Sequence, residues 1–104
     1  MLNNCKINFD KVSEYIRDVV NPASAHLSGL GIEISEYTFR KVCRQDNTKV
    51  TYDMHIFHLT FEEDRSQSYV EHWFKNEFND EDLVPYIQVN FSSVEGCATA
   101  LVMI

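Results

Sequence analysis

Residues 32–61, IEISEYTFRKVCRQDNTKVTYDMHIFHLTF, are the stretch of this sequence that decides the fold. β-Branched and aromatic residues dominate positions 32–44 and 49–61, and the polar run 45–48 between them is typical of a turn. The sequence therefore predicts two long antiparallel strands joined as a hairpin.

The apolar pattern of both strands changes phase partway along. In the first strand Ile32 and Ile34 occupy even positions, whereas Tyr37 and Phe39 occupy odd ones, and the second strand changes in the same way after Ile56. Because a slip of one residue exchanges the two faces of a strand, either each strand carries a β-bulge or something packs against both faces. We expect two partly covered faces.

Upstream of the hairpin, apolar residues recur at the three-to-four spacing of an amphipathic helix that starts near Asp10. They are Val12, Tyr15, Ile16, Val19 and Val20. Asn21-Pro22 is expected to interrupt this helix, because a residue before proline disfavours the helical region and proline suits the first position of a new helix. A second short helix is therefore predicted over residues 22–28, capped by Asn21.

Downstream of the hairpin, residues 67–79 carry an apolar stripe and predict a third helix, and residues 87–91 alternate as a third strand. The last segment, 97–104, is apolar on both faces, which is typical of a central strand or of an edge strand completed by a partner chain. The order α-α-β-β-α-β-β predicts one α+β domain over residues 1–104. We expect a four-stranded, mostly antiparallel sheet with two N-terminal helices and one helix between the two hairpins.

The composition is that of a folded, acidic globule. Hydrophobic residues make up 44% of the 104 residues, only three Gly and two Pro occur, and the formal net charge is −7. The electrostatic field of a protein with this negative charge repels phosphate backbones and anionic lipid and attracts basic proteins. We therefore expect no direct nucleic-acid or membrane binding, and a basic protein as the partner.

Three widely spaced cysteines, Cys5, Cys43 and Cys97, favour reduced thiols in the cytoplasm over a secreted disulfide framework. The N-terminus lacks the apolar core of a signal peptide, and apolar runs of membrane-spanning length are absent from the sequence. The expected compartment is therefore the cytoplasm.

Candidate catalytic and metal-binding patterns are weak. His55 and His58 lie three apart in a predicted strand, where their side chains point to opposite faces and do not share a metal. A glycine-rich phosphate loop is also missing from the sequence. We expect no cofactor, no metal and no enzymatic activity, with a Cys/His enzyme assembled only by the fold as the less favoured alternative.

The candidate binding residues are acidic clusters at the two ends of the third predicted helix, about 20 Å apart by helical rise. One cluster is Glu62, Glu63 and Asp64, and the other is Glu77, Asp80, Glu81 and Asp82. Trp73 and Tyr86 are the aromatic anchors expected beside them. The alternative is that both clusters are simply solvated helix ends.

These features predict a small acidic inhibitor, of the immunity-protein or antitoxin type, that covers the active or binding surface of a basic, nucleic-acid-active toxin or effector in a bacterial or phage setting. Two alternatives stay open. One is a phage-encoded inhibitor of a host defence complex, and the other is a self-associating subunit, a homodimer formed through the C-terminal strand.

Overall fold

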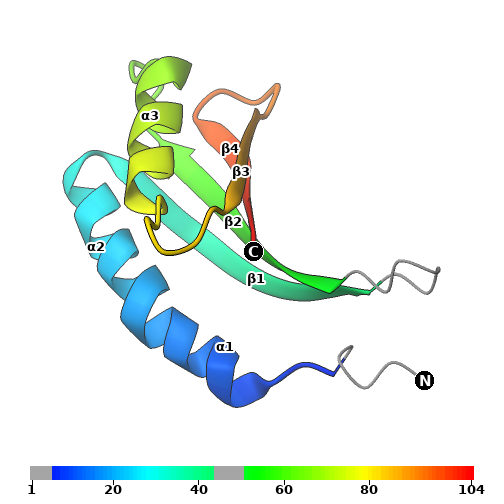
Figure 1. Cartoon of the computed structure of the whole chain (residues 1–104). Helices are drawn as coiled ribbons and strands as arrows, with labels where there is room; N and C mark the ends of the chain where they lie inside the picture. The colour runs from blue at the N-terminus through cyan, green and yellow to red at the C-terminus, as the bar shows by residue number, and fades with distance from the viewer. Residues whose placement is uncertain (1–5, 44–50) are drawn as a thin grey trace.

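The computed structural model describes residues 6–43 and 51–104, and its elements follow the predicted order (Figure 1). The predicted turn at residues 45–48 lies outside the described residues. The helical segments are α1 (Phe9–Tyr15), the π-helical segment η2 (Ile16–Val20), α2 (Asn21–Gly29) and α3 (Gln67–Glu77). The strands are β1 (Ile32–Cys43), β2 (Thr51–Phe61), β3 (Tyr86–Phe91) and β4 (Cys97–Met103).

The four strands form one antiparallel sheet in the order β1-β2-β4-β3. β4 therefore lies inside the sheet and pairs along both of its edges, which confirms its prediction as a central strand. Such a strand has no edge left for pairing with a second copy. The C-terminus is held in the same way, because the backbones of Ile104 and Asp53 exchange two hydrogen bonds of 2.9 and 3.0 Å.

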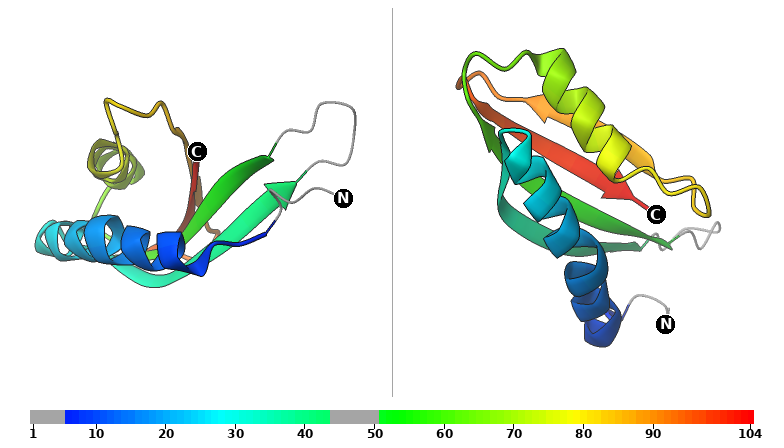
Figure 2. Two further views of the ribbon diagram at one scale, coloured as in Figure 1. Left: turned by 60° about the horizontal axis from the view of Figure 1, so that its bottom comes forward. Right: turned by 90° about the vertical axis from the view of Figure 1, so that its left-hand side faces the viewer.

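The helices cover one face of the sheet (Figure 2). α2 packs against β1 and α3 packs beside β3, and the two helices meet where the Tyr69 hydroxyl donates to the Leu30 carbonyl. The other face carries no helix in the described part of the chain. The predicted α+β class and element order are confirmed. No helix among the described residues has the length and apolarity needed to cross a bilayer.

The N-terminal helix differs from its prediction at both ends. Its N-cap is Asn8, whose side chain accepts from the backbone N–H groups of Asp10 and Lys11, so the predicted start near Asp10 is two residues late. The expected break at Asn21-Pro22 is wrong, because Asn21 is helical and donates its N–H to Ile16 across a π-turn. Proline lacks the N–H that an α-helix would need there, and the wider turn carries the chain past it.

The phase change in β1 comes from a β-bulge. The pairing with β2 shifts between Ile34 and Glu36, which leaves Ser35 as the extra residue, and its hydroxyl donates to the His58 carbonyl at 3.0 Å. Our expectation of two covered faces was wrong here. The inserted residue re-aims the side chains after it, so Ile34 and Tyr37 both face the helices although their positions differ in parity.

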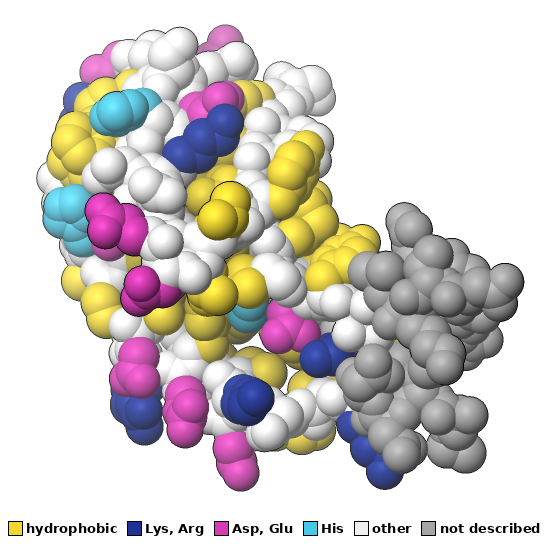
Figure 3. Space-filling model, in the orientation of Figure 1, with side chains coloured by type: hydrophobic (Ala, Val, Ile, Leu, Met, Phe, Trp, Pro, Cys, Tyr) yellow, Lys and Arg dark blue, Asp and Glu magenta, His cyan; other side chains and the backbone are white. Residues whose placement is uncertain are grey.

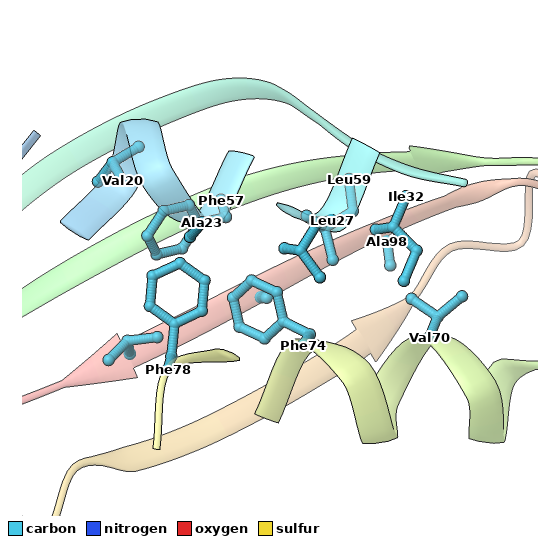
Figure 4. Packing of buried hydrophobic residues seen from close by; sticks show 12 residues of the cluster. Val20, Ala23, Leu27, Ile32, Phe57, Leu59, Val70, Phe74, Phe78 and Ala98 are labelled. Carbon is cyan, nitrogen blue, oxygen red and sulfur yellow. The ribbon is translucent and has the colours of Figure 1, made fainter. Parts of the chain in front are cut away.

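The core lies between α2, α3 and the sheet (Figure 4). Its centre is aromatic: Phe57 on β2 lies 5.5 Å from Phe74 and 4.7 Å from Phe78, measured between ring centroids. Leu27 and Val70 close it from the two helices, and both are fully buried. The predicted apolar stripe of the third helix is thus confirmed as core, with Ser66 capping the helix through the Tyr69 N–H.

Candidate functional site

The first helix stands away from the sheet and leaves a cavity beneath it. α1 buries none of its residues, in contrast to α2 and α3. Between α1, η2 and the far half of the β1–β2 hairpin lies a cavity of about 490 Å³. Figure 3 shows the corresponding recess above the helical segment at the bottom of the molecule, with charged side chains along its border.

A second cavity of about 350 Å³ adjoins the first. The two cavities share four lining residues: Tyr15, Val19, Leu83 and Ile104. One wall is the α1–η2 segment, the other is the loop 78–85 between α3 and β3, and the floor is formed by the strands. We call the two cavities together the groove.

His55 lines the inner wall of the groove beside Tyr15, and Tyr37 holds it from outside the lining. His55 is 4% exposed, its ring stacks on Tyr15 with 3.9 Å between centroids, and its Nδ1 forms a 2.7 Å hydrogen bond with the Tyr37 hydroxyl. The stack joins Tyr15, the last residue of α1, to β2, and the hydrogen bond joins β1 to β2. The three rings therefore hold α1 and the two strands together at the inner end of the groove.

Burial sets the protonation of these three groups. It lowers the pKa of His55 to about 4, and the nearby Asp53 carboxylate opposes the shift only in part. Burial also raises the pKa of Tyr37 to about 12 and raises the pKa of Tyr15. At neutral pH these three rings are therefore uncharged and offer aromatic faces and hydrogen-bonding groups.

Asp53 and Lys41 bring one ion pair to the same cavity. Lys41 Nζ lies 3.0 Å from Asp53 Oδ1 across the β1–β2 pairing. Asp53 Oδ1 itself has no accessible surface, whereas the Asp53 side chain as a whole is 40% exposed. The ammonium group compensates the charge of the carboxylate at this distance.

The rim of the groove is acidic. Six carboxylates line it against two lysines, which gives −4 with His55 neutral. The carboxylates are those of Glu14, Asp18, Asp53, Glu77, Asp80 and Glu81, and the lysines are Lys11 and Lys41. Some are already paired: Arg17 donates twice to Asp18, and His26 contacts Glu77 at 2.5 Å. Glu14, Asp80 and Glu81 have no ion pair in the described part of the chain.

The structure places the two predicted acidic clusters in separate regions of the molecule. Glu77, Asp80 and Glu81 line the groove, and Asp82 is exposed in the same loop. The cluster Glu62, Glu63 and Asp64 is exposed at the other end of the molecule, since the eight steps along the strand from Asp53 to Phe61 span roughly 26 Å.

The two predicted aromatic anchors lie outside the groove. Trp73 is half-buried on α3, edge-on to Tyr69 and His72, and it packs against the core. Tyr86 is 61% exposed and pairs with Met103, which places it on the sheet face opposite the helices. Neither residue lines the two cavities that form the groove.

The sequence reading missed the groove residues Glu14, Tyr15, Asp53 and His55. The sequence does carry a spacing pattern that could have identified two pairs of groove residues. Glu14 and Asp18 are four apart and thus share one face of a helix. Asp53 and His55 continue the helix-facing positions of Phe57 and Leu59 on β2, and polar residues on the covered face of a strand point to a functional or hydrogen-bonded position.

The opposite-face prediction for the two strand histidines is confirmed. His55 pairs with Val102 on the covered face, and His58 is exposed and pairs with Thr99. Among the described residues, no group of three His, Cys, Asp or Glu is placed to hold a metal ion. His58 and Cys97 line a recess of about 340 Å³ on the uncovered face, and no hydrogen bond joins this thiol to the imidazole in residues 51–104.

The two cysteines among the described residues differ in oxidation state. Cys97 has a free, half-buried thiol, whereas Cys43 is disulfide-bonded. The expectation of reduced thiols is therefore wrong for Cys43.

Comparisons with protein-family models, with curated proteins and with solved structures found no match to this chain.

Proposed function

We propose that this protein is a small acidic inhibitor, of the immunity-protein or antitoxin type, whose groove receives a basic segment of a nucleic-acid-active protein. The observation that supports this best is the groove itself, a hollow with a carboxylate rim and a floor of both apolar and polar strand residues. Charge complementarity of this kind speeds association and selects a basic partner over others.

Exposed apolar side chains beside the rim supply anchors for such a complex. Leu83 and Ile104, which line both cavities, are 45% and 42% exposed, and the neighbouring Val84 is 99% exposed. Large apolar groups surrounded by polar ones are typical of a binding site. An apolar contact at the centre and charged contacts at the rim give both affinity and choice of partner.

Inhibition follows from position and charge and needs no catalysis. A nuclease or nucleic-acid-binding effector presents basic residues to its anionic substrate, and an acidic protein that binds those residues excludes the substrate sterically and electrostatically. The same surface suits a phage-encoded inhibitor of a host defence complex, and the identity of the captured partner separates the two cases.

The test is affinity capture from native lysate at low and at moderate salt, followed by an activity assay on the captured protein. We expect a basic partner that is lost as salt rises and whose action on nucleic acid stops when the purified inhibitor is added. The double variant Asp80→Lys, Glu81→Lys should neither capture nor inhibit.

A matched control separates the groove from overall acidity. The variant Glu62→Lys, Glu63→Lys makes the same change in net charge at the far end of the molecule and should still capture and inhibit. Equal loss in both variants would assign binding to net charge alone, and a partner whose nucleic-acid activity persists in the complex would remove the inhibitor function.

The compartment belongs to the same proposal, and we infer the cytoplasm. The odd number of widely spaced cysteines favours it, although a disulfide such as that at Cys43 persists mainly in oxidising compartments. Alkylation of the protein in intact native cells decides between them: modification of Cys43 without reductant supports the cytoplasm, and protection of Cys43 until reduction places the protein elsewhere.

A further inference from the structure

The outer edge of β3 is open for pairing with another strand. β3 stands last in the order β1-β2-β4-β3, and among the described residues no strand pairs with its outer edge. Figure 2 shows it at the border of the sheet, beside α3. We propose that this edge pairs with the same edge of a second copy, so that two four-stranded sheets join into one. This homodimer is independent of the inhibitor function proposed above.

Hydrogen bonding inside the sheet determines which backbone groups of β3 point outward. The Ser92 N–H donates to β4, 3.0 Å from the Cys97 carbonyl oxygen. Residues of an antiparallel strand bond alternately to one side and to the other, so the even-numbered residues of β3 bond to β4. The N–H and C=O groups of the odd-numbered residues therefore point away from the sheet. These residues are Ile87, Val89 and Phe91.

The two edges of the sheet differ in their protection against such pairing. β1, at the other edge, carries a bulge at Ser35 and several charged residues along its length. The β3 sequence YIQVNF contains no charged residue, proline or glycine, and it pairs with β4 in one continuous register. Because bulges and charges are the features that keep natural edge strands from associating, β3 is the edge left available.

A twofold axis at Val89 matches β3 to itself. In an antiparallel pair around this axis Val89 faces its own copy, and Ile87 faces Phe91 of the second copy. All the outward-pointing residues then lie in hydrogen-bonded pairs, which gives about six intermolecular hydrogen bonds. On the uncovered face the same register sets Gln88 opposite Asn90 of the second copy. These amides already bond to each other within one chain at 3.0 Å, and amide groups both donate and accept.

The same axis passes beside the middle of α3. The helix packs beside β3, and recesses of about 420 and 360 Å³ lie between the two elements. Ile87 lines the first recess and Phe91 the second, and both recesses include His72 and Lys75. Val89 lies between the two strand residues and is therefore level with the two shared helix residues. A twofold axis at this level relates the middle of α3 to the middle of α3 in the second copy.

The charges on α3 are self-complementary around this axis. Lys75 pairs with Glu71 one helical turn before it at 3.0 Å, and both side chains line the recess on the β3 side. Two antiparallel copies of α3 related at their middle set Glu71 opposite Lys75 of the second copy, and the reverse pair forms by symmetry. Complementary charges of this kind fix the partner and the register of an interface. A second copy of the chain therefore fits this edge better than an unrelated strand.

The first test measures the association directly. We would determine the dissociation constant by sedimentation equilibrium and follow amide exchange by NMR at high and at low protein concentration. We expect a reversible dimer in which the amides of Ile87, Val89 and Phe91 are protected, with protection lost on dilution because these N–H groups bond only across the interface. A protein that stays monomeric up to about 1 mM would overturn the proposal.

Two variants place the interface at this edge. Gln88→Lys, Asn90→Lys sets like charges directly opposite each other twice across the axis and should weaken the dimer by roughly tenfold. Val89→Pro removes an N–H that points away from β4, so β3 keeps its pairing within the sheet, and the dimer should weaken by at least about tenfold. Circular dichroism verifies that each variant is folded.

A matched control separates the β3 edge from net charge. Glu33→Gln, Glu36→Gln makes the same change in net charge on β1 and should dimerise like the native protein. Lys75→Glu should weaken the dimer, and the double exchange Glu71→Lys, Lys75→Glu should restore it. Unchanged dimerisation in the folded edge variants, an equal loss in the control, or no restoration by the double exchange would contradict the twofold pairing.

Discussion

The covered face of the sheet has two halves that differ in what fills them. Over one half, α2 and α3 close on the sheet, and the rings of Phe57, Phe74 and Phe78 pack against one another. Over the other half, α1 buries no residue and touches the strands through its last residue, Tyr15, and a cavity of about 490 Å³ lies beside it. The same strand, β2, supplies the floor of both.

The difference follows from the residues that β2 turns toward the helices. Phe57 and Leu59 are apolar and need cover, whereas Asp53 and His55 are polar and keep partners of their own in Lys41 and Tyr37. A helix that closed over Asp53 would bury its ion pair with Lys41 at high cost. The polar end of the strand therefore keeps the groove open, while its apolar end holds the fold together.

The largest expected effect comes from emptying the packed half. Phe74→Ala removes a fully buried ring that contacts Phe57 and Phe78, and the cavity left behind should lower the free energy of unfolding by about 3–5 kcal/mol. Denaturation by urea measures this. A loss below about 1 kcal/mol would mean that the two halves are packed alike.

Amide hydrogen exchange should separate the halves in the native protein. Exchange in α3 is expected to need near-global unfolding, because its apolar face is buried, whereas α1 should open locally and exchange faster. Mass spectrometry of peptic fragments resolves the two segments. Equal protection of both helices would show that α1 is as firmly held as α3.

The groove half should respond to acid through His55. Because the pKa of His55 is about 4 in the folded protein and 6.5 ordinarily, the unfolded chain binds more protons between these values. Stability should therefore fall as pH decreases from about 6.5 to about 4. His55→Phe keeps a ring to stack on Tyr15 but does not titrate, so it should flatten this slope.

His58→Gln is the control for that experiment. It removes an exposed imidazole on the opposite face and leaves His55 in place, so the slope should persist. Thermal unfolding across this pH range measures all three proteins. An unchanged slope in His55→Phe would assign the acid response to other groups.

The smallest effect is expected at the outer edge of the groove half. Phe9 begins α1 and is 74% exposed, so Phe9→Ala should change the free energy of unfolding by less than about 0.5 kcal/mol. The same urea titration as for Phe74→Ala makes the pair directly comparable. A cost near that of Phe74→Ala would contradict the difference between the halves.

Much of the packed half could be predicted from the sequence. Periodic patterns predicted the apolar stripe of α3 and the alternation of β3, because periodicity reports which face of an element is buried. The central position of β4 was predicted from a segment that is apolar on both faces. The bulge at Ser35 and the continuous helix through Pro22 could not be placed this way. A phase change fits either a bulge or a second covered face, and proline is accommodated when a helix widens locally.

The sequence by itself determined the element order, the α+β class and the acidity of the protein, because these depend on local pattern and on composition. Only the tertiary structure decided the groove, because Tyr15, His55, Leu83 and Ile104 are far apart in the chain and meet through the packing of four different segments. Which of sixteen acidic residues form one rim depends on the same packing, since a charge count carries no positions. The cavity is a property of how the elements stand to one another, and local pattern does not report that.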